Sequence, residues 1–307
     1  MAVYTSINID EISSFLNSYN LPELKSFKGI SSGVTNTNYV IETIDAKYIL
    51  TIFEQAQPKD IQYYVDLMSF LSNKKYHCPT PIQNQEGFHL GEIKNKPALL
   101  VSLLGGGELK SVSNDNCFAV GASLAQMHQL TQDYKVFIAN PRGLNWMNRV
   151  FDEIHPLLSN DEVEMIRDEL IFLDQNFNSN LPSGIIHADL FKDNVLFYNH
   201  NVTGVIDFYY ACYDLYIYDI AIALNDWCIN EFFLIDVEKK RYFLNGYESI
   251  RELSEDEKNF LPISLRLAAM RFWLSRLYDF HFKKDGEITY TKAPEHFKKI
   301  LQNYQRS

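Results

Sequence analysis

The sequence predicts an α+β protein of two lobes: an N-terminal antiparallel sheet with a helix, and a larger, mainly helical C-terminal lobe. Short apolar segments separated by turn residues fill the first third of the chain, as in a meander of strands. Most of the remainder carries apolar residues at helical spacing. The composition changes at Gly105-Gly106-Gly107. We therefore predict one domain over residues 1–104 and a second over residues 105–307.

The expected elements of the first domain follow from its apolar pattern. Ile9, Ile12, Phe15 and Leu16 recur at helical spacing and predict a short amphipathic helix within residues 6–19. A second helix over about 61–71 follows Pro58 and ends before Cys78-Pro79. The predicted strands are residues 27–30, 38–43, 48–53, 88–93 and 98–103.

The second domain is expected to be helical with one interruption. The predicted helices are residues 118–130, 163–177, 219–229 and 265–282. Residues 185–207 alternate short apolar runs with turn residues, which indicates a small strand-rich insert. A capping box at Ser254 to Glu257 indicates a helix start.

Composition and charge narrow the class of protein. Apolar residues make up 46% and charged residues 22%, as in ordinary globular chains. The net charge of −11 argues against a nucleic-acid or anionic-membrane surface and favours small-molecule chemistry. We find no signal-peptide pattern, no membrane-length apolar run and no C-x-x-C pair among the four cysteines. We expect a soluble, cytoplasmic protein with reduced thiols, and the sequence leaves its oligomeric state open.

Residues 187–194 read H-A-D-L-F-K-D-N, and two apolar runs follow. A hairpin with a two-residue loop at His200-Asn201 would place Asn194 opposite Asp207, about 4.5 to 5.5 Å away. An amide oxygen and a carboxylate at one point suit a hard cation such as Mg²⁺. Asp189 lies in the loop just before, where a carboxylate can orient a substrate hydroxyl and accept its proton during attack on phosphorus.

The spacing H-x-D-L-x-x-x-N, with a second aspartate after the far strand, resembles the catalytic and metal-binding segments of kinase-like phosphotransferases. H-A-D-L-F-K-D-N-V-L-F with G-V-I-D-F resembles their aminoglycoside-phosphotransferase-like branch. Within that branch, G-I-S-S-G-V-T-N-T-N-Y, Y-I-L-T-I-F-E and A-I-A-L-N-D-W-C resemble the bacterial homoserine kinases. Such segments extend from residue 1 to about residue 280.

The resemblance implies a two-lobed protein-kinase-like fold and Mg²⁺-dependent phosphoryl transfer from ATP to the hydroxyl of L-homoserine, a step of threonine biosynthesis. It makes Asp189 the catalytic base and Asn194 and Asp207 the magnesium ligands. The residues implied to cover the ATP phosphates are Ser31, Ser32, Gly33, Val34, Thr35 and Asn36, and those implied to contact adenine are Ser102 and Leu103.

One position departs from the family pattern. Related phosphotransferases place a Lys or Arg in the third strand, where this chain has Thr51. The following helix has no evident Glu partner for such a cation. Lys28 and Lys47 are possible substitutes, and the phosphate-contacting cation stays unassigned.

The substrate pocket should provide a cation for the carboxylate of homoserine and acceptors for its ammonium group. Arg271 or Arg276 can pair with the carboxylate, or either can be an ion-pair partner of Asp279 or another acid. Further candidate substrate residues are Asp214, Asn225 and Trp227. We expect His187 to hold the loop by hydrogen bonding and Asp219 to cap a helix.

Two alternatives remain at this stage. The catalytic spacing reports the chemistry and not the acceptor, so another small alcohol, such as choline, methylthioribose or an aminoglycoside, is open. Thr51 also keeps open a pseudokinase that binds nucleotide or a partner protein.

Overall fold

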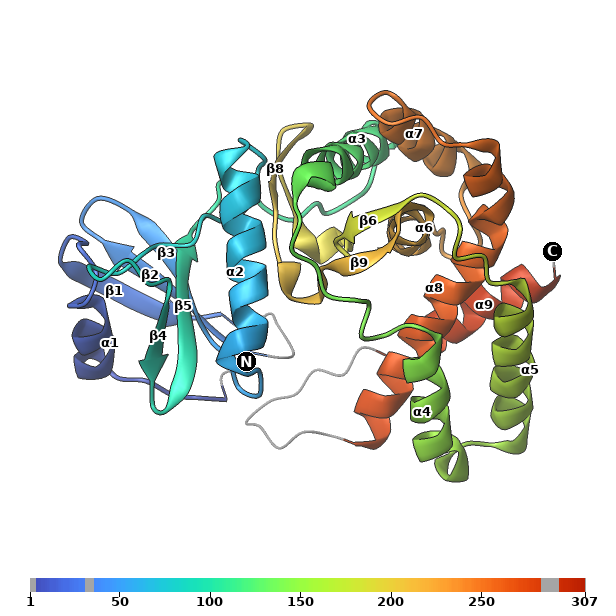
Figure 1. Ribbon diagram of the computed structural model, residues 1–307, viewed down its shortest axis with the longest axis horizontal. Coiled ribbons are helices and arrows are strands. Elements are labelled where there is room, and N and C mark those ends of the chain that lie inside the picture. The colour runs from blue at the N-terminus through green and yellow to red at the C-terminus, as the bar shows by residue number, and fades with distance from the viewer. Residues whose placement is uncertain (1–3, 31–35, 283–292, 307) are drawn as a thin grey trace. The chain divides into compact units, whose positions relative to one another are not determined.

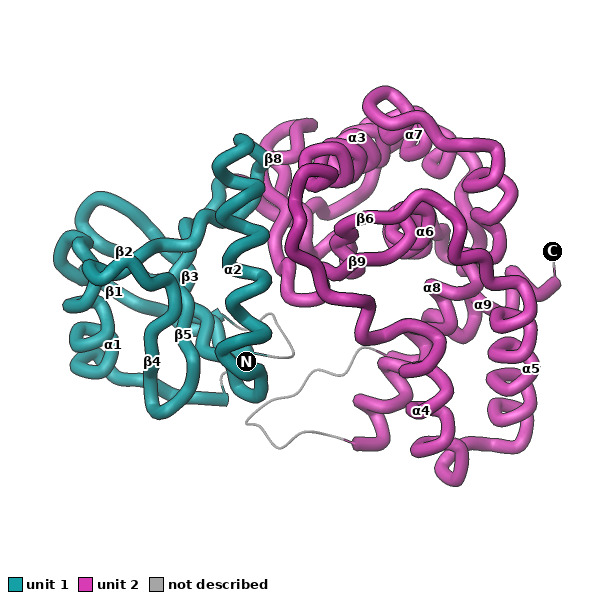
Figure 2. Tube along the Cα trace, in the orientation of Figure 1, with its two compact units in different colours: residues 1–105, 283–291 teal, residues 106–282, 292–307 magenta. Residues whose placement is uncertain are grey.

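The computed structural model describes residues 4–30, 36–282 and 293–306, and Figure 1 shows the order of its elements. The chain separates into two compact units between Gly105 and Gly106 (Figure 2). The predicted boundary lies one residue earlier. The nucleotide-binding role predicted for the first domain and the catalytic role predicted for the second remain predictions.

Unit 1 is built on one antiparallel sheet in the spatial order β1-β2-β3-β5-β4. Its strands are β1 (Leu24–Gly29), β2 (Thr37–Thr43), β3 (Lys47–Ile52), β4 (Leu90–Ile93) and β5 (Lys96–Ser102). Helix α1 (Ile9–Leu16) packs Ile12, Phe15 and Leu16 against alternate residues of the sheet, among them Tyr39, Ile41, Leu50 and Ile52. Because side chains alternate across a strand, the residues between these belong to the opposite face.

The elements predicted for this unit are confirmed, with ends shifted by at most three residues. Helix α2 (Pro58–Asn73) follows β3 and buries Ile61, Val65 and Leu71. In β5 every residue from Ala98 to Val101 is buried, so the centre of the sheet is covered on both faces.

Unit 2 is mainly helical, as predicted. Its longer helices are α3 (Asn114–Leu130), α4 (Leu144–Ile154), α5 (Asn160–Asn176), α6 (Tyr216–Trp227), α7 (Val237–Glu248), α8 (Glu255–His281) and α9 (Glu295–Arg306). The sequence reading missed α4, α7 and α9. Helices α3 and α8 begin well before their predicted starts because capping boxes at Ser113 and Ser254 stabilise polar first turns. No helix within the described ranges is long and apolar enough to cross a membrane.

Two glycines let α3 and α7 approach closely. A Cβ atom on Gly121 would lie 2.1 Å from the carbonyl oxygen of Phe243, and one on Gly246 would lie 2.0 Å from that of Phe118. Neither position has room for a side chain. The close approach brings side chains near the C-terminal ends of α3 and α7 into contact.

The predicted strand-rich insert is present as two short antiparallel pairs. Strand β6 (Ser183–Ile186) pairs with β9 (Cys212–Leu215), and β7 (Val195–Tyr198) pairs with β8 (Asn201–Val205).

The predicted register of the second pair is wrong. The turn is Asn199-His200, not His200-Asn201, because Asn199 adopts a left-handed backbone with φ 56°. Beyond the turn the register shifts between Phe197 and Leu196, where β8 contains one extra residue, Thr203. The carbonyl of Asn194 consequently accepts a hydrogen bond from the N–H of Ile206 at 2.9 Å, so Asn194 faces Ile206 and not Asp207.

Candidate active site

The segment that carries Asp189 runs from the end of β6 to a short 3₁₀ turn, Lys192–Asn194. The side chain of Asp189 is 15% exposed. Nδ2 of Asn194 donates to the backbone oxygen of Asp189 at 2.8 Å and to its Oδ2 at 3.2 Å. The predicted base and one predicted metal ligand are therefore neighbours.

Asp207 follows β8 and precedes the 3₁₀ turn Phe208–Tyr210. Its φ of 64° is left-handed, a conformation that costs a non-glycine residue roughly 1 kcal/mol and that is frequent at functional sites. Its chain neighbour Ile206 is bonded to Asn194, so the end of the hairpin brings both predicted metal ligands to one place.

The donor set around Asn194 and Asp207 fits a magnesium ion that also binds a nucleotide. Both of these hydrogen bonds of the Asn194 side chain use Nδ2, so Oδ1 is the atom that would bind a metal ion. Among the described residues no group of three or more His, Cys, Asp or Glu side chains forms a metal cage. Mg²⁺ in phosphotransferases takes only one or two protein ligands and completes its shell with phosphates and water.

Asp219 binds the backbone of the loop that precedes Asp189. Its Oδ2 accepts the N–H of His187 at 2.7 Å, and its Oδ1 accepts the N–H of Ala188 at 2.8 Å. Ala188 is itself left-handed, with φ 63°. The expectation that Asp219 caps its helix is wrong: Leu215 precedes α6, and the buried carboxylate instead orders the loop.

A buried network extends from Asp219 to α3 and α7. Nε2 of His128 donates to Asp219 at 3.0 Å, and Nδ1 of His128 accepts from the hydroxyl of Tyr247 at 2.8 Å. Burial lowers the pKa of His128 and outweighs the opposing effect of the Asp219 hydrogen bond. Burial acts to raise the pKa of Asp219, but the hydrogen bond from His128 helps to hold this pKa below its usual value. The pair is therefore a neutral imidazole on a carboxylate.

His187 binds the loop internally, as expected. Its Nε2 donates to the carbonyl oxygen of Ile206 at 3.0 Å, and its Nδ1 accepts the N–H of Asp189 at 3.3 Å. Burial lowers the pKa of His187, which favours the neutral form that this pair of bonds requires. The side chain thus connects the loop of the base to the strand end before Asp207.

Two predicted substrate residues have structural contacts instead. Trp227 is fully buried, and its Nε1 donates to the carbonyl oxygen of Leu190 at 3.0 Å. Asn225, also fully buried, donates to the carbonyl oxygen of Leu265 at 2.9 Å and accepts from the Tyr304 hydroxyl at 2.7 Å. We therefore assign these two side chains to the support of the loop and to helix packing, and not to substrate contact.

The other three predicted substrate residues differ in position. Nη1 of Arg271 lies 3.9 Å from Oδ1 of Asp189. Arg276 donates to the carbonyl oxygen of Ala293 at 3.1 Å, and burial lowers its pKa to about 10. Asp214 accepts from Nδ2 of Asn140 at 2.7 Å, and burial raises its pKa. Arg271 is thus the one of the three that contacts the predicted base.

The predicted nucleotide contacts lie in unit 1. Residues 31–35 lie outside the described residues, and Oδ1 of Asn36 accepts the N–H of Glu54 at 3.4 Å. The N–H of Ser102 donates to Thr80 at 2.9 Å, and that of Leu103 donates to Lys47 at 3.2 Å. Since both N–H groups already donate to carbonyl groups of unit 1, adenine recognition at Ser102 and Leu103 would depend on their own carbonyl groups.

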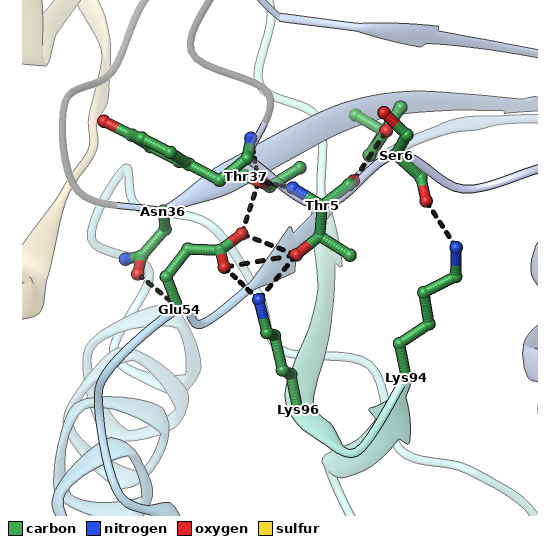
Figure 3. A network of polar contacts seen from close by, with 9 residues as sticks. Thr5, Ser6, Asn36, Thr37, Glu54, Lys94 and Lys96 are labelled. Atoms are coloured by element: carbon green, nitrogen blue, oxygen red, sulfur yellow. Dashed lines mark hydrogen bonds and ion pairs between the residues drawn. The ribbon is translucent and has the colours of Figure 1, made fainter. Parts of the chain in front are cut away.

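The third strand has Thr51 at the position of the expected cation. Its hydroxyl donates to Oδ1 of Asn38 at 2.7 Å. A lysine and a glutamate do pair in this unit: Lys96 contacts Glu54, which also accepts from the hydroxyls of Thr5 and Thr37 (Figure 3). Thr37 lies two residues from Tyr39 and Lys96 two residues from Ala98, so both share the face covered by α1, whereas Thr51 lies on the opposite face. Lys96 therefore does not replace the missing cation.

Sequence reasoning missed the roles of Asp219 and His128. A charged residue inside the apolar run of α6 is the signal that marks Asp219, since carboxylates are rarely buried unless they are paired. His128 carries no comparable signal in the sequence. Its role depends on the packing of α3 against α7.

Comparison with known proteins identifies the class that this fold and site define. The model of the phosphotransferase enzyme family, APH, matches residues 26–253, and the chain belongs to this family. A solved amicoumacin kinase has the same fold, with a TM-score of 0.75 over 98% of this chain and 92% of that one at 17% identity.

More similar sequences cover the whole chain. A homoserine kinase of Methylobacillus flagellatus is 42% identical over 99% of this chain and 95% of its own length. One of Neisseria meningitidis serogroup B is 40% identical over 98% of this chain and 99% of its own length.

Proposed function

We propose that this protein is a homoserine kinase, which transfers the γ-phosphoryl group of ATP to the side-chain hydroxyl of L-homoserine and forms O-phospho-L-homoserine. The observation that carries the choice of acceptor is the similarity to homoserine kinases over nearly the full length of both chains. The fold by itself defines only a phosphotransferase, since similar structures include an amicoumacin kinase and an aminopropanol kinase.

Asp189 is the proposed catalytic base. Its carboxylate orients the homoserine hydroxyl and accepts its proton as the oxygen attacks the γ-phosphorus. Asn194 holds Oδ2 of this carboxylate, and His187 holds its backbone N–H. Asp219 binds the two preceding N–H groups, so the base is oriented before the substrate binds.

Asn194 and Asp207 are the proposed ligands of Mg²⁺, which neutralises the charge on the nucleotide phosphates when bound. The left-handed backbone at Asp207 re-aims its carboxylate where β8 ends. The hydrogen bond between Ile206 and Asn194 keeps the two ligand-bearing segments together.

The test is Mg²⁺-dependent release of ADP from ATP with L-homoserine, choline, methylthioribose and kanamycin as acceptors. We expect release with L-homoserine, and loss of at least about 100-fold in kcat for Asp189→Asn with nearly unchanged KM values. The matched control is Asp193→Asn, an exposed aspartate of the same segment. Preference for another acceptor would refute the choice of homoserine, and a fully active Asp189→Asn would refute the base.

A further inference from the structure

A buried guanidinium lies beside the proposed base and has an unused donor. Arg271 is 3% exposed, and its Nη1 has no hydrogen-bond partner within the described structure. The nearest carboxylate oxygen in an ion pair with it is Oδ1 of Asp189, at 3.9 Å. That distance is too long for a hydrogen bond. A buried donor without a partner costs about 1–3 kcal/mol, so a ligand that supplies an acceptor there gains affinity.

A second arginine lies next to the first. The guanidinium carbon of Arg142 is 4.9 Å from the ring centroid of Tyr210, and that of Arg271 is 5.4 Å from the same ring. Nη1 of Arg142 donates to the hydroxyl of Ser275, one helical turn after Arg271, at 3.0 Å. Tyr210 closes the turn that begins after Asp207. The two cations therefore share one aromatic ring and one face of α8.

The guanidinium groups of Arg142 and Arg271 carry like charges, and that of Arg271 is buried. Burial lowers the pKa of Arg271, and the charge of Arg142 lowers it further, while Asp189 and two phenol groups act in the other direction. With Arg142 and Arg271 charged and Asp189 ionised, the cluster has one positive charge in excess. A carboxylate of the substrate would neutralise it, whereas an ammonium group would be repelled.

The two carboxylate oxygens of Asp189 face different groups. Oδ2 faces Asn194, the proposed metal ligand, at 3.2 Å, and Oδ1 faces Arg271. In phosphoryl transfer the nucleotide phosphates lie with the metal, and the acceptor attacks from the other direction. The arginines are thus on the side where the part of the acceptor beyond its hydroxyl must lie.

We propose that Arg142 and Arg271, which both contact the ring of Tyr210, form the subsite that binds the α-carboxylate of the acceptor. This deepens the proposed function and rests on it. Arg271 makes the buried contact nearest the base, and Arg142, fixed by Ser275, supplies the second guanidinium. The subsite selects amino acids over amino alcohols of the same length.

The test uses two analogues of homoserine to distinguish the contribution of the carboxylate to binding from the contribution of the other groups. L-2-Aminobutanoate keeps the carboxylate and ammonium groups of homoserine but lacks the hydroxyl, and 3-amino-1-propanol lacks only the carboxylate. The variants are Arg142→Gln and Arg142→Lys, with Arg149→Gln on an exposed position of α4 as the matched control. The measurements are the KM values of homoserine and ATP, kcat, and the dissociation constants of both probes by calorimetry.

Arg142→Gln should raise the KM of homoserine and the dissociation constant of L-2-aminobutanoate together, by about 10- to 100-fold. The KM of ATP and the affinity for 3-amino-1-propanol should change by less than about threefold, and Arg142→Lys should recover part of the loss. Unchanged binding of L-2-aminobutanoate, with a lower kcat or a higher KM for ATP, would overturn the proposal and assign the arginines to the phosphoryl group. Wild-type protein that binds L-2-aminobutanoate but does not phosphorylate homoserine would refute the proposed function alone.

Discussion

The carboxylate of Asp219 accepts a hydrogen bond from Nε2 of His128 at 3.0 Å while both side chains are fully buried. The same carboxylate receives the backbone N–H groups that precede the proposed base. The buried charge of Asp219 is tolerated because three hydrogen-bond donors contact the carboxylate. We therefore expect the order of the loop that carries the proposed base, and the stability of unit 2, to depend on the Asp219 side chain.

Replacement of Asp219 by Asn should reduce both the order of the loop and the stability of unit 2. An amide has one oxygen to accept hydrogen bonds and places an NH₂ group against an N–H donor. We expect Asp219→Asn to lower the free energy of unfolding by about 2–4 kcal/mol in urea and kcat by about 10- to 100-fold. Asp256→Asn, on an exposed first turn of α8, is the control and should change neither quantity. Equal behaviour of the two variants would contradict the role of Asp219.

The buried histidine should make stability depend on pH. Burial lowers the pKa of His128 in the folded state, so the unfolded chain binds more protons below about pH 6.5. Stability is then fully present above that pH and falls as the pH decreases toward the folded pKa. The difference in unfolding free energy between wild type and His128→Gln should shrink by about 1 kcal/mol between pH 7.5 and 5.5. A constant difference over this range would show that His128 does not titrate as described.

Ala188 should be replaceable by glycine with a gain in stability. Its φ of 63° is unfavourable for a residue with a Cβ atom, and glycine removes that cost. We expect Ala188→Gly to raise the free energy of unfolding by about 0.5–1 kcal/mol with activity retained. Ala221→Gly in the interior of α6 should instead lower it by about 1 kcal/mol. A loss at both positions would mean that the backbone at Ala188 is not strained.

A side chain at Gly121 should separate α3 from α7. The added Cβ atom would lie 2.1 Å from a backbone oxygen, so the helices must move. Gly121→Ala should lower the free energy of unfolding by about 1–3 kcal/mol, and it should reduce kcat because the His128–Tyr247 contact spans these helices. Gly107→Ala, whose added Cβ atom would have no atom of the described residues within 4 Å beyond its chain neighbours, is the near-neutral control in thermal unfolding.

The proposed metal ligands can be tested by metal titration. Asp207→Asn keeps the shape of the side chain and removes its charge, so the Mg²⁺ concentration for half-maximal activity should rise by at least about tenfold. EDTA should abolish the activity of the wild type, and added Mg²⁺ should restore it. An unchanged Mg²⁺ requirement in Asp207→Asn would exclude this residue as a ligand.

Much of the fold could be predicted, and the segment of the proposed site could be located, because both depend on local pattern. The strands and the helices with clear periodicity were predictable from residues close in the chain, and Asp189, Asn194 and Asp207 belong to one short segment. The register of the hairpin was not predictable, because the left-handed backbone at Asn199 moves the turn by one residue. Helices α4, α7 and α9 were not predicted, and most residues of α9 are polar.

The two-part α+β architecture could be predicted from the local spacing of apolar residues, and the family and the segment with the proposed base and metal ligands from their resemblance to known motifs. Which distant residues support that segment depends on how the helices pack. Asp219 meets His128 and Tyr247 because glycines let α3 and α7 approach. Arg142 joins Arg271 around Tyr210 because α8 packs near α4. Such contacts depend on how helices are rotated and packed, which the periodicity of a single helix does not specify.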